Sequence, residues 1–199
     1  VLVVRGEGQQ TRYVDLALSS EMIADRIAFR TSSIEETALA SAELGGYDAV
    51  ILVGPRSLSS GEVDALTRYV ERGGGVLLFP SEQAQASTYN PLLGAMEAGT
   101  IQGFSGSPDG GQSVASFERV DLEHPLFEGI FNQERRRRDA EVEQPEIYYT
   151  MNLRPSGRAG QMLIELSNGV PFLHEVRHGG GVMLVTAVAP TPRWSDLPV

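Results

Sequence analysis

The stretch that decides the fold reads YDAVILVG at residues 47–54 and SSGEVDALTRYVERGGGVLLF at residues 59–79. Its two ends are apolar runs of strand length, and the segment between them repeats apolar residues with helical spacing. Ser59 with Glu62 three residues later fits a capping box, and Gly73 is a typical helix end. The stretch therefore predicts a strand–helix–strand unit whose parallel strands are joined by a right-handed connection.

The residues before this stretch continue the alternation of strands and helices. Residues 1–4 are a continuous apolar run, which suits a strand covered on both faces. We expect a short helix at residues 13–24 and a second strand at residues 27–30. Ser32 and Glu35 match a second capping box, which predicts a further helix that ends at two glycines just before residue 47.

The second half of the chain predicts a different arrangement. Residues 99–112 are rich in glycine and serine, which is typical of a loop or an irregular edge. The pair Asn168-Gly169 fits a tight hairpin turn, because both residues tolerate positive φ. Strands are predicted at residues 113–120, 146–152, 161–166, 170–176 and 182–188. We expect them to extend a mostly parallel sheet with antiparallel strands, within one α/β domain of residues 1–199.

Composition excludes several classes of function. The chain has no cysteine, so disulfides, thiolate catalysis and cysteine-ligated zinc are excluded. A net charge of -10 argues against a nucleic-acid partner, since affinity for the phosphate backbone depends on clustered cations. All 16 basic residues are arginine, which we attribute to a GC-rich genome or a heat-adapted host. We expect neither a cofactor nor a metal.

The stretch at residues 47–79 resembles the class I glutamine amidotransferase-like superfamily, in which a buried strand, a helix ending in glycines and a second strand lead to a nucleophile elbow. The resemblance implies a flavodoxin-like three-layer sandwich. In active members the elbow holds a cysteine between glycines, near backbone amides that stabilise an oxyanion. Here the cysteine position falls on Pro80 or on Ser81, and no elbow glycine follows. We therefore expect a domain that is not an enzyme.

A serine nucleophile at Ser81 would need a histidine base, and the chain has His124, His174 and His178. His174 and Glu175 together are similar to the superfamily's catalytic pair, but they fall within a predicted strand. Adjacent strand residues face opposite ways, so both cannot readily point into one site. His178 lies beside three glycines and is interpreted as a turn residue. A turn-capping role is the ordinary interpretation of Ser81 as well.

Three further patterns are interpreted as structural. Asp121, Glu123 and His124 are possible metal ligands, but their spacing matches no established site, and we expect this segment to dock a loop on the core. The glycines at residues 6–8 predict a tight turn rather than a phosphate site. The run from Arg135 to Arg138 is flanked by acidic residues, which indicates a solvated, self-paired loop. A contact between this run and anionic lipid or an acidic partner is the alternative.

A second, closer resemblance rests on the motifs at residues 168–173, 179–182 and 194–198, together with residues 47–53 and 73–79. These resemble the soluble domain of bacterial membrane proteins with an N-terminal double-transmembrane region, similar to the Bat or aerotolerance-related group. The resemblance implies two membrane helices before this domain, which would project on the outer, periplasmic side of the cytoplasmic membrane. This arrangement fits a sequence that opens directly on a strand. We therefore expect the chain to be an excised piece of a longer protein.

These inferences together predict a non-catalytic extracytoplasmic domain that binds a protein or a small ligand in a membrane-anchored assembly. A ligand site should lie where the carboxyl ends of the parallel strands open a crevice. The residues placed at its mouth are Gly54, Pro55, Arg56, Pro80, Ser81 and Glu82. Among them, the guanidinium of Arg56 is suited to pairing with a carboxylate. The alternatives are a serine-dependent amidase or hydrolase that uses Ser81 with a histidine, and an oligomerisation module.

Overall fold

A computed structural model describes most of the chain. The described residues are 1–9, 11–20, 22–23, 26–27, 29–83, 85–108, 111–128, 144–156 and 160–197. The arginine run from Arg135 to Arg138 lies outside them. Among the described residues, no helix has the length and apolar character needed to cross a bilayer.

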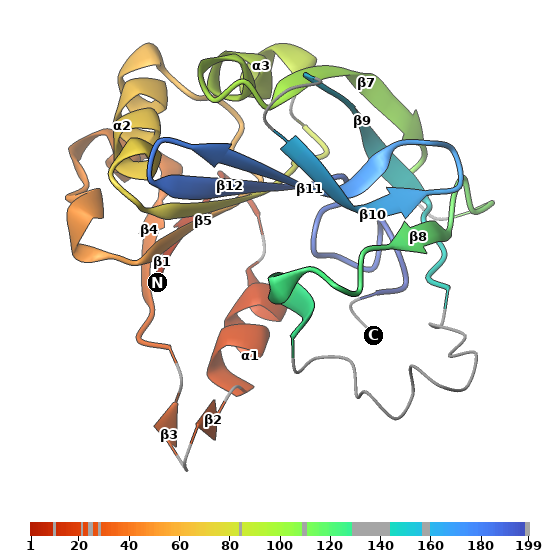
Figure 1. Cartoon of the computed structure of the whole chain (residues 1–199), viewed down its shortest axis with the longest axis horizontal. Coiled ribbons are helices and arrows are strands. Elements are labelled where there is room, and N and C mark those ends of the chain that lie inside the picture. The colour runs from red at the N-terminus through yellow and green to blue at the C-terminus, as the bar shows by residue number, and fades with distance from the viewer. Residues whose placement is uncertain are drawn as a thin grey trace.

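One eight-stranded sheet organises the chain (Figure 1). Its first five strands, in spatial order, are parallel: β4 (Ser32–Glu35), β1 (Leu2–Arg5), β5 (Ala49–Val53), β6 (Gly75–Phe79) and β12 (Gly181–Thr186). Three antiparallel strands continue the sheet: β11 (Pro171–His178), β10 (Gly160–Leu166) and β8 (Phe117–Val120). The predicted parallel sheet with an antiparallel extension in the second half of the chain is therefore confirmed.

Helices cover the two faces of the sheet unequally (Figure 1). On one face lie α2 (Ser60–Glu71), α3 (Ala86–Ala95) and a two-stranded sheet of β7 (Gly99–Gly106) and β9 (Tyr149–Pro155). On the other face lie α1 (Arg12–Ser20) and the short helix η3 (Pro125–Phe127). The remaining elements are the pair β2 (Met22–Ile23) and β3 (Arg26–Ile27) and the 3-10 helices η1 (Glu36–Ser41) and η2 (Leu44–Gly46).

Local chemistry explains the elements that were predicted best. At the start of α2, the Ser59 hydroxyl accepts from the Glu62 N–H, and the Glu62 carboxylate accepts from the Ser59 N–H. This is the predicted capping box, and it satisfies two otherwise free donors. The turn between β10 and β11 contains Gly169 with φ of 80°, as expected for the Asn-Gly pair.

The second predicted capping box is wrong. Ser32 to Glu35 form β4, an edge strand parallel to β1, and Arg5 pairs with Glu35 across the two strands at 3.0 Å. The predicted second strand at residues 27–30 is likewise wrong, because the strand beside β1 begins only at Ser32. Pairing with the buried strand β1 outweighs a local capping pattern, so the expected helix is reduced to η1 and η2.

Residues 99–112 are predicted to be a loop or an irregular edge, and their first half is the strand β7, whose pairing with β9 is irregular between Ile101 and Phe104. The glycines there serve close approach rather than irregular structure. A Cβ on Gly99 would lie 2.3 Å from the Arg154 carbonyl oxygen, and one on Gly106 would lie 2.0 Å from that of Tyr148. Only glycine lets β7 run this near to β9. Helix α3 carries Pro91 in its interior and was not predicted.

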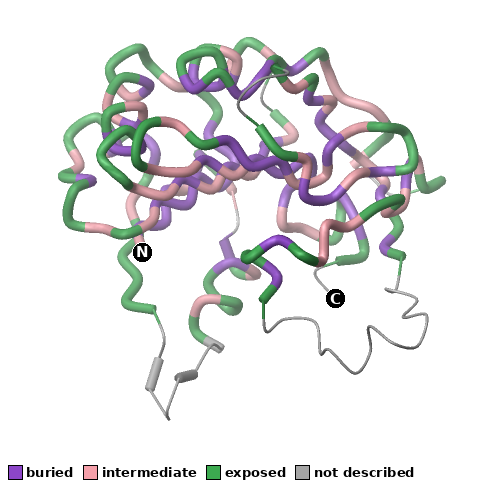
Figure 2. The backbone as a smooth tube through the Cα atoms, in the orientation of Figure 1, coloured by how far each residue is buried: buried purple, intermediate pink, exposed green. Residues whose placement is uncertain are grey.

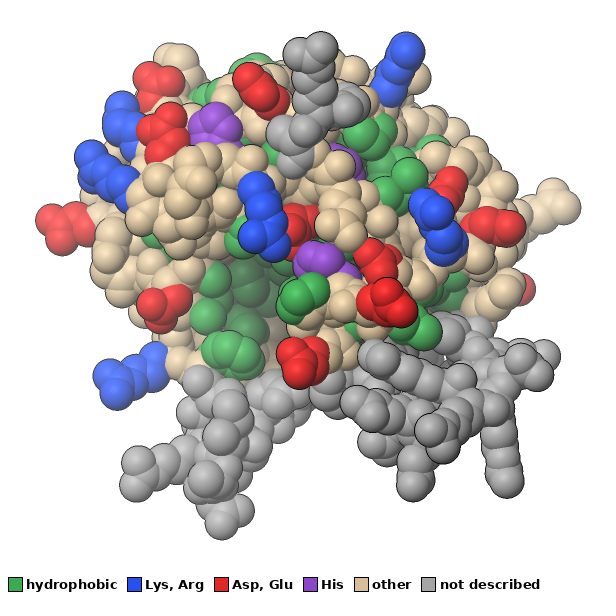
Figure 3. Space-filling view, viewed as in Figure 1, with side chains coloured by type: hydrophobic (Ala, Val, Ile, Leu, Met, Phe, Trp, Pro, Cys, Tyr) green, Lys and Arg blue, Asp and Glu red, His purple; other side chains and the backbone are tan. Residues whose placement is uncertain are grey.

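The buried residues form separate cores on the two faces of the sheet (Figure 2). The larger core packs alternate residues of the central strands, such as Leu52 and Leu78, under α2 and α3. On the α1 side the cover is incomplete, because Leu77, Phe79 and Leu184 of β6 and β12 remain partly exposed. Figure 3 shows hydrophobic side chains lining a hollow on this side.

Candidate functional site

The six residues predicted to surround a crevice do lie together. Gly54 to Arg56 follow β5, and Pro80 to Glu82 follow β6, its parallel neighbour. The Gly54 N–H donates to the Phe79 carbonyl oxygen at 3.0 Å, which ties the two strand ends. As the sequence predicted, both segments emerge at the carboxyl edge of the sheet.

The turn after β1 closes one side of this edge. Gly6 packs so tightly that a Cβ there would lie 1.9 Å from the Gly54 carbonyl oxygen. The Gln9 N–H donates to the Gly6 carbonyl oxygen at 3.0 Å, which confirms the predicted tight turn. Gly54 has φ of 59°, a conformation that favours glycine, and the Gln9 side chain lies where a Cβ would stand.

Ser81, one of the two residues considered in the sequence for the nucleophile position, is fully buried. Its Oγ accepts from Gln9 Nε2 at 3.2 Å and from the Gln83 N–H at 3.1 Å. The second of these bonds is a local turn, in agreement with the turn-capping interpretation of Ser81.

A buried tyrosine joins the two strand ends. The Ser81 N–H donates to Tyr89 Oη at 2.9 Å, and Tyr89 Oη donates to the Pro55 carbonyl oxygen at 2.9 Å. Tyr89 lies in α3 and has no exposed surface. Burial raises the pKa of its hydroxyl well above the ordinary value, so the group stays a neutral donor. We call Tyr89, Pro55 and Ser81 with these two bonds the tyrosine clamp.

Glu82 connects the same edge to the end of the chain. One carboxylate oxygen pairs with Arg193 at 2.7 Å, and the other accepts from Trp194 Nε1 at 3.2 Å. Trp194 is fully buried and packs edge-on against Tyr149, with ring centroids 4.5 Å apart. Burial and the negative charge of Glu82 raise the pKa of Tyr149. Both carboxylate oxygens of Glu82 thus already have partners within the chain.

Arg56 is the only exposed residue of the six, and its charged side chain already has a partner. Its guanidinium contacts the Glu7 carboxylate at 2.5 Å, and its backbone N–H donates to Glu36 Oε2 at 2.7 Å. The carboxylate expected to meet Arg56 is therefore present, but it belongs to the chain itself. Its use by a ligand stays a prediction.

The three histidines lie apart from Ser81. His178 pairs with Glu71 at 3.5 Å and faces Gly181 at the start of β12, one strand length or about 17 Å from the carboxyl edge. His174 lies on β11, two strands or about 10 Å across the sheet from β6. Among the described residues no imidazole contacts Ser81, whose bonds all go to Gln9, Gln83 and Tyr89.

His174 and Glu175 face opposite sides of the sheet, as their position on one strand predicts. His174 is buried on the α3 side, whereas the Glu175 carboxylate pairs with His124 at 3.4 Å and with Arg177 at 3.0 Å. Both His174 ring nitrogens lack a hydrogen bond. Burial lowers the pKa of His174, and the backbone at Gln161 and Ala98 opposes this only in part.

The proposed metal cluster is a structural feature. His124 Nδ1 accepts from the Leu126 N–H at 3.3 Å and so caps η3, while Asp121 accepts from Gln161 at 2.7 Å. Phe127 anchors this loop in the core, as expected. Within the described part of the chain, no group of three His, Asp or Glu side chains could hold a metal ion.

Sequence reasoning missed Gln9, Tyr89 and Arg193 as parts of this edge. Gln9 and Arg193 come from segments far from this edge in sequence, and Tyr89 lies in α3, which was not predicted. It also missed two recesses elsewhere, of about 620 and 800 Å³. The first lies between α2 and η2, and the second lies beside β7 and β9.

Comparisons with known proteins support the fold. No family model matches the sequence, and a comparison with curated proteins gives no match. Among solved structures, a cytoplasmic protein from Salmonella typhimurium is 14% identical with a TM-score of 0.69, over 97% of this chain and 89% of that chain. A ThuA-like protein from Bacteroides uniformis is 14% identical with a TM-score of 0.61, over 94% of this chain and 80% of that one.

The fold also occurs within a longer protein. A β-galactosidase from Bacillus circulans is 12% identical with a TM-score of 0.62, over 96% of this chain but 29% of that chain. Identities this low show the fold alone. Together with the sheet order, they confirm the predicted flavodoxin-like, glutamine amidotransferase-like sandwich.

Burial of His174 predicts a specific loss of stability in acid. Because its folded-state pKa lies below the ordinary 6.5, the unfolded chain binds the proton more tightly. Stability from this group should be complete above pH 6.5 and fall below it, by up to about 1.4 kcal/mol per pH unit. Urea unfolding of the chain and of His174→Leu at pH 7.5 and 5.5 measures the difference.

The variant should lose this part of the pH dependence. Leu163→Ala is the control, because it alters a buried residue on the neighbouring strand β10 without removing a titratable group, and it should keep the pH dependence of the unmodified chain. An equal stability loss on acidification in the chain and in His174→Leu would contradict the assignment.

Proposed function

We propose that this chain is a non-catalytic domain that binds a protein or ligand partner, on the periplasmic side of a bacterial membrane-anchored protein. The observation that carries the proposal is the state of Ser81, which is fully buried and bonded to Gln9, Gln83 and Tyr89. A domain that keeps the fold of an enzyme superfamily but buries the residue at the expected nucleophile position is suited to binding rather than catalysis.

The bonds at the corner argue against acyl transfer in detail. Such a reaction needs a base beside the nucleophile and free N–H donors for the oxyanion. The Ser81 N–H already donates to Tyr89, and the Gln83 N–H donates to Ser81 Oγ. Pro80 has no N–H to offer. A serine hydrolase, the alternative function, would have to break these bonds and bring an imidazole to Ser81.

The incompletely covered face of the sheet supports a role in binding a protein. Leu77, Phe79 and Leu184 stay partly exposed there. Leu126 of η3, which lies on the same face of the sheet, is 40% exposed. The hollow in Figure 3 is lined by hydrophobic side chains. Contiguous apolar surface of this kind marks interaction sites more often than it marks free surface.

The location on a membrane-anchored protein comes from the resemblance to the double-transmembrane-region group. Its motifs include the segment around Trp194, and this residue holds Glu82 and Tyr149 at the carboxyl edge. The β-galactosidase similarity is compatible with a domain of this fold inside a longer chain. Partners within the same membrane assembly, or a second copy of the protein, are the binding partners that we propose.

The burial and hydrogen bonds of Ser81 predict that its hydroxyl does not react as a nucleophile. A fluorophosphonate probe should leave Ser81 unmodified under conditions that fully label a known serine hydrolase, since the hydroxyl is buried and no imidazole can take its proton. Mass spectrometry of the intact chain and of its peptides reads the result. An adduct on Ser81 that is lost in Ser81→Ala and kept in the exposed-site control Ser60→Ala would establish the hydrolase instead.

The periplasmic location predicts labelling from outside the cytoplasm. The chain has no native cysteine, so Ser57→Cys in the full-length protein adds one exposed thiol to this domain. A membrane-impermeant maleimide should label it in cells whose outer membrane is permeabilised. Leu66→Cys, at a fully buried position, is the control and should react only after denaturation. Labelling of Ser57→Cys only after the inner membrane is broken would place the domain in the cytoplasm.

A further inference from the structure

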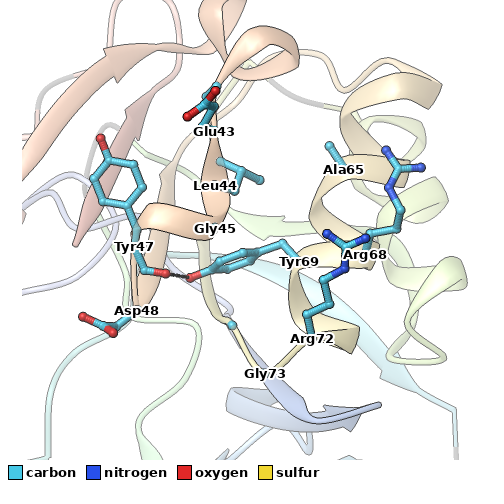
Figure 4. Close-up of a pocket in the computed structure, with 12 residues that line it drawn as sticks. Glu43, Leu44, Gly45, Tyr47, Asp48, Ala65, Arg68, Tyr69, Arg72 and Gly73 are labelled. Atoms are coloured by element: carbon cyan, nitrogen blue, oxygen red, sulfur yellow. Dashed lines mark hydrogen bonds between the residues drawn. The ribbon is translucent and has the colours of Figure 1, made fainter.

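A recess lies at the end of the sheet opposite the closed corner, between α2 and the segment that contains η2 (Figure 4). Its volume is about 620 Å³, within the range of small-molecule sites. Arg68 and Arg72 stand on its α2 side, while Leu44, Gly45 and Tyr47 form the facing wall. We call this feature the arginine recess.

Arg68 and Arg72 are exposed arginines whose charges are not used within the described part of this acidic chain. Five other arginines form ion pairs with acidic residues, namely Arg5, Arg56, Arg119, Arg177 and Arg193. Within the described residues, Arg68 and Arg72 make no ion pair and no side-chain hydrogen bond. Arg68 lies in the last turn of α2 and Arg72 is its C-cap residue, four positions later, so the two side chains project from one side of the helix end.

Two like charges at this spacing destabilise an isolated helix. One arginine near the end of α2 is explained by the helix dipole, which favours positive charge at the carboxyl end. The second arginine adds repulsion between like charges, and an anion bound between the two guanidinium groups would relieve it.

The floor of the recess is rigid. Tyr69 Oη donates to the Tyr47 carbonyl oxygen at 2.9 Å, and a Cβ on Gly74 would lie 2.3 Å from the Tyr69 ring. The ring is therefore fixed between Gly74 and the segment that carries Tyr47. Burial raises the pKa of Tyr69, so its hydroxyl stays neutral. With Leu44 and Ala65, the floor offers a preformed surface for an apolar or planar group.

The acidic residues of the recess leave the arginines free. Glu43 and Asp48 belong to its lining, on the wall opposite α2. In Figure 4 their carboxylates point away from Arg68 and Arg72 and out from the recess. Asp48 lies near Tyr69 and contributes to the raised pKa of that hydroxyl. The positive and negative groups are thus separated on opposite walls.

We propose that the arginine recess binds an organic anion, with a phosphate or carboxylate head held between Arg68 and Arg72 and a planar or apolar body against Tyr69 and Leu44. Guanidinium groups suit both heads, because they form paired, charge-assisted hydrogen bonds with phosphate and with carboxylate. This site is separate from the carboxyl edge of the sheet and does not depend on the function proposed for it.

The test is a titration of the ¹⁵N-labelled chain with inorganic phosphate, phenyl phosphate and benzoate. Phenyl phosphate should give saturable shifts of the Gly73 and Gly74 amide signals, which border the recess. It should bind at least about tenfold more tightly than inorganic phosphate if the body contacts Tyr69. Benzoate distinguishes a carboxylate head from a phosphate head, and tight binding of either ring compound supports the proposal.

The variant Arg68→Gln/Arg72→Gln should weaken binding by at least about tenfold and should remove most of its dependence on salt. The control Arg12→Gln/Arg30→Gln removes the same two positive charges at exposed positions far from the recess in sequence, and it should bind like the unmodified chain. Thermal unfolding without ligand checks that both variants fold.

Unsaturable shifts for every probe would overturn the proposal, as would equal loss of binding in both double variants. If Arg68→Gln/Arg72→Gln lowers thermal stability without ligand while the unmodified chain binds no probe, the two arginines serve the helix dipole alone.

Discussion

A buried hydroxyl at Tyr89 sets the shape of the carboxyl edge. It donates to the carbonyl oxygen of Pro55 after β5 and accepts from the N–H of Ser81 after β6, so one side chain from α3 fixes both strand ends. Each partner is a buried backbone group, and leaving such a group unpaired costs about 1–3 kcal/mol. Opening this edge would therefore leave several polar groups without their hydrogen-bond partners at once, including the Gln9 side-chain amide that donates to Ser81.

The clamp also determines what the fold is able to do. The backbone donors that an acyl-transfer enzyme would direct at an oxyanion are used here to hold Ser81 and Gln83 in place. Glu82 is held in the same way by Arg193 and Trp194. The surfaces that remain available lie elsewhere, in the hollow beside β6 and β12 and in the arginine recess at the other end of α2.

The sequence predicts what local chemistry controls and misses what distant pairing controls. The capping box at Ser59 and the turn at Gly169 form because neighbouring residues satisfy one another's backbone groups. Ser32 and Glu35 show the same local pattern, yet pairing with β1 makes them a strand. At the site, the six edge residues follow from strand order alone. Gln9 reaches Ser81 and Tyr89 reaches Pro55 across long sequence separations that a single sequence does not reveal.

Native-state hydrogen exchange of the Ser81 amide shows whether the turn around Ser81 is a closed part of the core. We expect this N–H, bonded to Tyr89, to exchange only with global unfolding, with the same opening free energy as the amide of Leu78 in β6. The exposed Gly61 amide at the start of α2 gives the fast reference. Exchange of the Ser81 amide through a local opening, at a rate near that of Gly61, would contradict the account.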